Sequence, residues 1–201
     1  PGAALPPQRT DGVILVPRDN GDADESILRA AFLLGKRANL DLRFSYALSP
    51  IPDAPLYILP SLRTTQSITA TRLDQLLEKV AAGAVLFLSL DDTLFRRIPE
   101  ITGVQMAWRA CIPAERTVMF RGEKLPLHAP VRYEVESADA EILAHDETGA
   151  PCFFRHAYGR GQVFFMTMPF ERGAAVHVPL VRLGPEGGEQ LRLDGRAGGV
   201  E

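Results

Sequence analysis

Short continuous apolar runs are the feature of this sequence that most constrains its fold. Three occur in the first half, at residues 12–17, 56–60 and 84–89. A strand that is apolar at nearly every position is buried on both faces, as in a parallel sheet covered by helices. The runs therefore predict an α/β domain with a mainly parallel sheet.

Amphipathic segments separate these runs. Asp24 can cap one helix and Thr69 a second, and Asn39 and Gly83 are expected near their ends. The apolar positions with helical spacing are Ile27, Ala31, Leu34 and Ala38 in the first helix, and Leu73, Leu76, Leu77 and Val80 in the second. Residues 42–46 alternate like a strand with one face less buried. The order strand, helix, strand, strand, helix, strand predicts right-handed crossovers and a doubly wound sheet.

The second half has a different pattern, with strand-like pieces and no helical spacing between them. They are found at residues 131–135, 141–145, 151–155 and 162–167. Turn residues separate them, including Tyr158-Gly159-Arg160-Gly161, which precedes a strand and so favours a hairpin over a phosphate loop. We expect an antiparallel meander at one edge of the sheet, and more strand than helix between residues 103 and 127.

Length and composition set further limits. The 201 residues suit one domain, and the 46% hydrophobic content suffices for a core. A net charge of −3 gives no electrostatic reason to expect nucleic acid or a membrane surface as a partner. Neither a signal-peptide pattern nor a membrane-spanning run is found, which favours a cytoplasmic location. We interpret residues 1–11 as a linker, 12–171 as the α/β domain, and 172–201 as a poorly ordered or loosely docked tail.

Four segments together resemble a known family. They are residues 26–40 (SILRAAFLLGKRANL), 56–61 (LYILPS), 76–92 (LLEKVAAGAVLFLSLDD) and 158–171 (YGRGQVFFMTMPFE). In order and spacing the chain resembles the class I glutamine amidotransferase-like domain found in several glycoside hydrolases, including the trimerisation domain of family 42 β-galactosidases. The resemblance implies a flavodoxin-like fold and a domain that packs on a catalytic barrel, helps to form a homo-oligomer and can lie close to bound carbohydrate. It implies that the parent protein is a glycoside hydrolase.

The resemblance also locates a degenerate catalytic site. In catalytic members a cysteine nucleophile follows the strand that matches residues 84–88, and a histidine base lies in a later strand that ends in H-P-E. Ser89 stands at the first position and Met168 at the second, while Pro169 and Glu171 remain. A thioether cannot accept a proton at neutral pH, so a serine beside it stays a weak nucleophile. We therefore expect a domain without catalytic residues, and enzymatic use of Ser89 is the least favoured alternative.

Other polar residues follow the strands at the edge where open α/β sheets bind ligands. Asp19 and Glu25 come after the first strand, and Asp91 and Asp92 after the third. They can form a carboxylate cluster for sugar hydroxyls or a cation, which would make the domain a sensor for a small molecule or sugar. The more conservative interpretation is that Asp91 or Asp92 caps the next turn.

Trp108 is the best candidate for a stacking contact with carbohydrate, although such residues more often belong to a core. The four histidines and two cysteines lack the spacing of metal ligands, so neither a metal nor a cofactor is expected.

Overall fold

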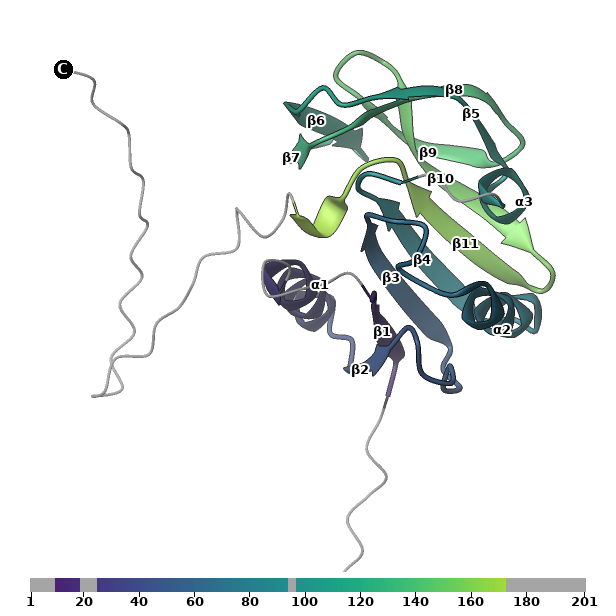
Figure 1. The fold of residues 1–201 in the computed structure, drawn as a ribbon. Coiled ribbons are helices and arrows are strands. Elements are labelled where there is room, and N and C mark those ends of the chain that lie inside the picture. Colours follow the sequence, from purple (N-terminus) through teal and green to yellow (C-terminus); the bar gives the residue numbers. More distant parts are fainter. Residues whose placement is uncertain (1–9, 19–24, 94–96, 173–201) are drawn as a thin grey trace, which may run out of the picture.

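The computed structural model describes residues 10–18, 25–93 and 97–172 and contains one nine-stranded mixed sheet (Figure 1). In spatial order its strands are β2 (Leu42–Tyr46), β1 (Gly12–Val16), β3 (Leu56–Leu62), β4 (Val85–Leu90), β11 (Gly161–Met166), β10 (Pro151–Tyr158), β9 (Glu141–Asp146), β6 (Ala114–Phe120) and β7 (Glu123–Ala129). A separate two-stranded sheet joins β5 (Val104–Ala110) to β8 (Arg132–Ala138). The architecture is therefore α/β-like with a mixed sheet.

The first five strands of the large sheet, β2 to β11, are parallel. They include the three apolar runs, and the first four residues of β1 are buried as a strand covered on both faces requires. The last of them, β11, comes from the end of the described chain and pairs with β4, Phe165 lying beside Leu88. The parallel sheet predicted from the apolar runs is confirmed for this half.

Helices cover both faces of the parallel strands. Helix α1 (Glu25–Arg37) packs on the face that carries Ile14, and α2 (Ala70–Ala81) on the opposite face with Val13 and Leu15. The predicted helix ends are confirmed at two points. The Thr69 hydroxyl accepts a hydrogen bond from the backbone N–H of Arg72, and Asn39 takes the left-handed conformation (φ 58°) just after α1. A third, short helix is α3 (Ile98–Thr102).

The second half is antiparallel, as its pattern predicts. The turn between β10 and β11 is the predicted hairpin, and Gly161 is required there because a Cβ atom would lie 2.1 Å from the carbonyl oxygens of Val80 and Ala84. The predicted single meander needs a correction. Strands β5 and β8 are not part of the large sheet. They form their own sheet, which packs Val104 and Tyr133 against the main core.

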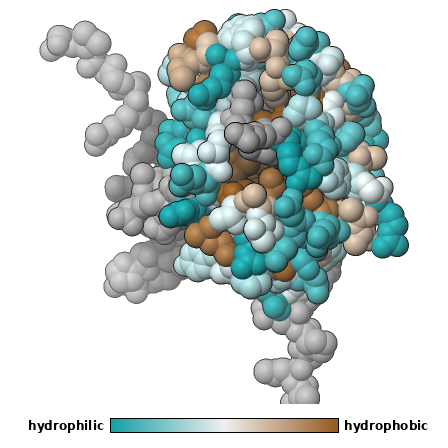
Figure 2. All heavy atoms as spheres, turned by 45° about the vertical axis from the view of Figure 1, so that its right-hand side comes forward, coloured by the Kyte–Doolittle hydropathy of each residue, from teal (hydrophilic) through white to brown (hydrophobic). Residues whose placement is uncertain are grey.

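Three groups of buried apolar side chains hold the layers together, the largest lying between the large sheet and the layer formed by α2, α3 and the β5–β8 sheet. Figure 2 shows hydrophobic residues gathered around the middle of one face and hydrophilic residues over most of its rim. Just before β1, the Asp11 carboxylate accepts a hydrogen bond from the Asp41 N–H over 2.8 Å. The expected linker at residues 1–9 and the tail at 173–201 lie outside the described residues. No helix in the described part of the chain is long and apolar enough to cross a membrane.

Candidate functional site

Three polar side chains meet at the carboxyl end of the parallel strands. Ser61 comes from β3, Ser89 from β4, and Glu171 from the helical turn at residues 170–172 that follows β11. Ser61 is a non-glycine residue at positive φ (48°), at a register shift between β3 and β4. This strained conformation directs its backbone N–H at the Ser89 hydroxyl oxygen, 2.7 Å away.

Glu171 completes the group. Its Oε2 atom accepts hydrogen bonds from the Ser89 hydroxyl over 2.7 Å and from the Ser61 hydroxyl over 3.1 Å. Its Oε1 atom is buried with no hydrogen-bond partner among the described residues. Burial raises the pKa of this carboxyl, although both serine hydroxyls oppose the shift. The site therefore shifts the titration of Glu171 toward higher pH than in water.

The burial of these groups limits their chemistry. Ser89 is 0% exposed and Glu171 is 2% exposed, so the hydroxyl faces protein and not a cleft. The Glu171 carboxyl therefore activates no nucleophile that a substrate could reach. What the arrangement does instead is fasten the ends of β3 and β4 to the turn after β11.

Met168, expected at the degenerate position of the base, is a buried apolar residue. It packs in the core of the antiparallel half, with Met166 and Cys152 among its neighbours. Glu171 is the residue that reaches the serine. Strand β11 ends at Met166, and the residues that follow it bring Glu171 to the hydroxyl of Ser89.

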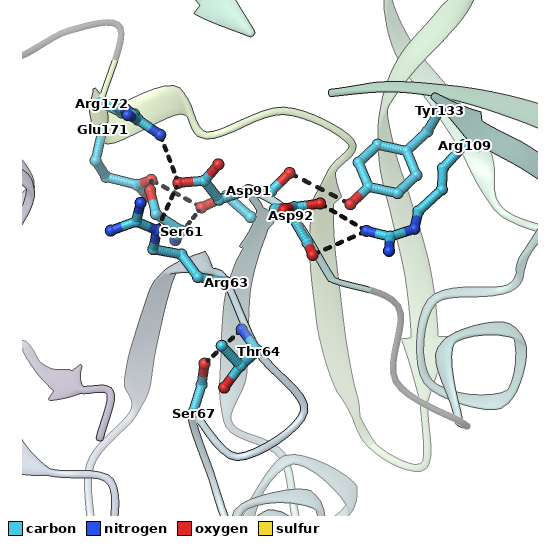
Figure 3. A network of polar contacts seen from close by, with 11 residues as sticks. Ser61, Arg63, Thr64, Ser67, Asp91, Asp92, Arg109, Tyr133, Glu171 and Arg172 are labelled. Atoms are coloured by element: carbon cyan, nitrogen blue, oxygen red, sulfur yellow. Dashed lines mark hydrogen bonds and ion pairs between the residues drawn. The ribbon is translucent and has the colours of Figure 1, made fainter. Parts of the chain in front are cut away.

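Asp91 lies beside this group as a buried anion between two arginines (Figure 3). Its Oδ2 atom is 2.9 Å from Arg172 Nη1 and 3.4 Å from Arg63 Nε, and the side chain is 1% exposed. The two arginine side chains are about one-third exposed, and they supply the charge that lets the carboxylate stay buried. Asp91 thus ties the loop after β4 to β3 and to the turn after β11.

Asp92 points the other way, toward the β5–β8 sheet (Figure 3). Arg109 Nη1 donates to its carboxylate over 2.6 Å and to its backbone oxygen over 2.9 Å. The Tyr133 hydroxyl donates to the backbone oxygens of Asp91 and Thr93, and burial raises its pKa. These contacts fix the small sheet to the edge of the large one.

Arginines engage both carboxylates, and the proposed capping role of Asp91 or Asp92 stays a prediction, because residues 94–96 of that turn lie outside the described residues. Arg97 is the N-cap residue of α3 and makes no side-chain capping bond. The structure also separates the two: Asp91 is inaccessible, whereas Asp92 is exposed.

The remaining candidates are scattered. Trp108 lies on β5 and is 42% exposed, so it is not a core residue. Asp19 lies outside the described residues, and Glu25 opens α1 with a side chain that is likewise outside them. In the described ranges no group of three His, Cys, Asp or Glu side chains could hold a metal ion.

Sequence reasoning missed Ser61, Arg63 and Arg172 as members of the site. The one available signal was that Ser61 follows a buried strand next to Pro60. No sequence signal marked the two arginines. They belong to the site because they contact the buried carboxylate of Asp91, and the burial of Asp91 is known only from the fold.

Comparisons with known proteins agree with this geometry at the level of the fold. No family model and no curated protein matches the chain by sequence. Exo-β-1,4-mannosidase Op5Man5 from Opitutaceae bacterium strain TAV5 superimposes with a TM-score of 0.71 at 16% identity, over 84% of this chain and 32% of that one. Gan42B, a GH42 β-galactosidase from G. stearothermophilus, gives 0.66 at 14% identity, over 87% and 31%. The fold matches a segment of glycoside hydrolases.

The chain spans about a third of the length of these two enzymes. A cytoplasmic protein of Salmonella typhimurium LT2 also superimposes on this chain, with a TM-score of 0.54 and 13% identity. There the match covers 78% of this chain and 87% of the other, so a fold of this kind also occurs in a protein of similar size.

Proposed function

We propose that this chain is a non-catalytic accessory domain of a glycoside hydrolase-type protein, which packs on a catalytic barrel or mediates oligomerisation. In this proposal the fold is the flavodoxin-like, class I glutamine amidotransferase-like one, with helices α1 and α2 on opposite faces of the parallel strands. The observation that carries it is the match of most of this chain to less than a third of the length of GH42 β-galactosidases.

The buried serine supports the non-catalytic part. A working nucleophile needs an exposed hydroxyl and a base within reach, and the partners of Ser89 are a backbone N–H and a buried carboxyl. In this proposal the end of β4, which corresponds to the strand end that carries the nucleophile in amidotransferases, holds β3 and the residues after β11 in place.

The coding sequence on either side of this chain tests the barrel part. We expect a catalytic barrel with paired acidic residues in the same polypeptide or in a subunit that co-purifies with it. Purified on its own, the chain is expected not to hydrolyse nitrophenyl glycosides or glutamine. A protein with no barrel in its chain or its complexes, or hydrolysis by the isolated chain that Ser89→Ala abolishes, would contradict the proposal.

A second function is a stand-alone sugar or small-molecule sensor. It is favoured by the Salmonella protein, most of which has this fold, and by the exposed side chain of Trp108 on β5. Trp108 would stack on a pyranose ring. A saturating sugar at 100 times its dissociation constant should stabilise the fold by about 2.7 kcal/mol in a thermal-shift assay. Loss of that shift in Trp108→Ala would support the sensor, and no shift with any sugar tested would remove it. A cytoplasmic location is part of the proposal for either function.

A further inference from the structure

The nine-stranded sheet ends in two edge strands of opposite character. At one edge, β7 carries exposed Glu123 and Lys124, and Pro126 in its middle. Charged side chains and proline on an edge strand hinder pairing by another chain. The β7 edge is therefore protected against association.

The other edge, β2, has no such protection. Phe44 is 49% exposed and Tyr46 is 69% exposed, and Arg43 is the single charged residue of the strand. Among the described residues β2 pairs with β1 alone, so its outer backbone groups face away from the sheet. Exposed aromatic residues on an open edge favour association, and proteins normally avoid that combination unless the edge is used.

A groove of about 450 Å³ accompanies this edge. It lies between β2 and α1, and Phe32 of α1 stacks on Phe44 with ring centroids 5.6 Å apart. Val16, Leu28 and Tyr46 add apolar surface. An added strand obtains its affinity from backbone hydrogen bonds and its specificity from pockets for alternate side chains, and this edge offers both.

We propose that β2 pairs with β2 of a second copy of this chain, antiparallel about a two-fold axis, so that the two sheets become continuous. The strand is self-complementary in this arrangement. With Phe44 on the axis, Leu42 lies opposite Tyr46 of the second copy and Arg43 lies opposite Ser45, so apolar residues pair on one face and no like charges oppose each other on the other. The inference deepens the oligomerisation role in the proposed function and does not depend on a barrel.

The test compares Tyr46→Asp with a matched control, Ile142→Asp, by sedimentation velocity of the full 201-residue chain. Both side chains are exposed on strands of the same sheet, at 69% and 44%, so neither change should disturb the core. We expect a dimer whose dissociation constant rises by about tenfold or more in Tyr46→Asp, and stays unchanged in Ile142→Asp. Wild-type β2 amides should exchange hydrogen more slowly as protein concentration rises.

Three outcomes would overturn the proposal. They are a wild-type chain that stays monomeric, an assembly that survives Tyr46→Asp, and β2 protection that does not depend on concentration, which would mean that something other than a second copy covers the edge. An assembly that survives Tyr46→Asp removes only the β2 interface and leaves the oligomerisation role standing. The coding-sequence test decides the barrel independently of either result.

Discussion

The Ser89 hydroxyl donates a hydrogen bond to Glu171 Oε2 over 2.7 Å, although the two residues are 82 positions apart in the chain. The bond joins the end of β4 to the turn after β11, and neither group meets solvent. Several measurable properties of the protein follow from this buried pair and from the residues around it.

Glu171→Gln should change how stability depends on pH. The unfolded glutamate titrates near its ordinary pKa of 4.5, whereas burial raises the pKa in the folded state. The folded protein then binds more protons, so the free energy of unfolding falls as pH rises above about 4.5, by at most about 1.4 kcal/mol per pH unit for one proton. The glutamine variant should lose this component of the slope. Urea unfolding between pH 4 and pH 8, read against wild type, measures it, and parallel curves would show that Glu171 does not titrate as expected.

Ser89→Ala should destabilise the fold by about 1–3 kcal/mol, because it leaves the Ser61 N–H without its acceptor and takes a donor from Glu171 in a dry site. Chemical denaturation gives the number. Any glycosidase activity of the parent protein should persist in this variant after correction for folded fraction, and its specific loss would restore a catalytic role for the serine.

Asp91→Ala and Asp92→Ala form a matched pair of neighbours. Asp91 is buried between arginines, so its loss removes the anion that both contact and should cost about 3 kcal/mol, the lower end of the range for buried pairs, because both arginines are partly exposed. The exposed Asp92–Arg109 pair should contribute about 1 kcal/mol or less. Thermal unfolding of the two variants decides the order, and equal losses would contradict the burial argument.

Gly161→Ala should be poorly tolerated, with a loss of about 1–3 kcal/mol or more, since the added methyl group meets two backbone carbonyls at 2.1 Å. Gln162→Ala, at the exposed next position, is the control and should change stability by less than about 0.5 kcal/mol. Comparable melting temperatures for both variants would mean that the hairpin relaxes without cost.

The parallel half of the fold was predictable because its buried strands can be recognised from their own residues. The continuous apolar runs at β1, β3 and β4 leave no alternative to burial on both faces, and Thr69 and Asn39 mark helix ends by their own side-chain chemistry. The separate β5–β8 sheet was not predictable, because strand patterns do not state which partner a strand will choose. Its position depends on contacts such as Tyr133 to the backbone of Asp91, over 42 residues.

The site shows the same division. The resemblance singled out Ser89 at the nucleophile position and noted that Glu171 remains, but it did not predict that Glu171 accepts a hydrogen bond from Ser89. The path of the chain after β11 brings Glu171 to Ser89. That path depends on tertiary contacts such as the Arg172–Asp91 bond, which the sequence does not reveal.

The place of β11 in the sheet bears on how the protein is made. This strand is synthesised last among the described elements, yet it lies between β4 and β10 in the centre of the sheet. In a nascent chain that has not reached residue 166, the backbone edge of β4 that pairs with β11 therefore has no complete partner strand. The sheet can be completed only after residue 166 has been synthesised, so the protein should depend more on chaperones than a fold whose strands pair in order of synthesis.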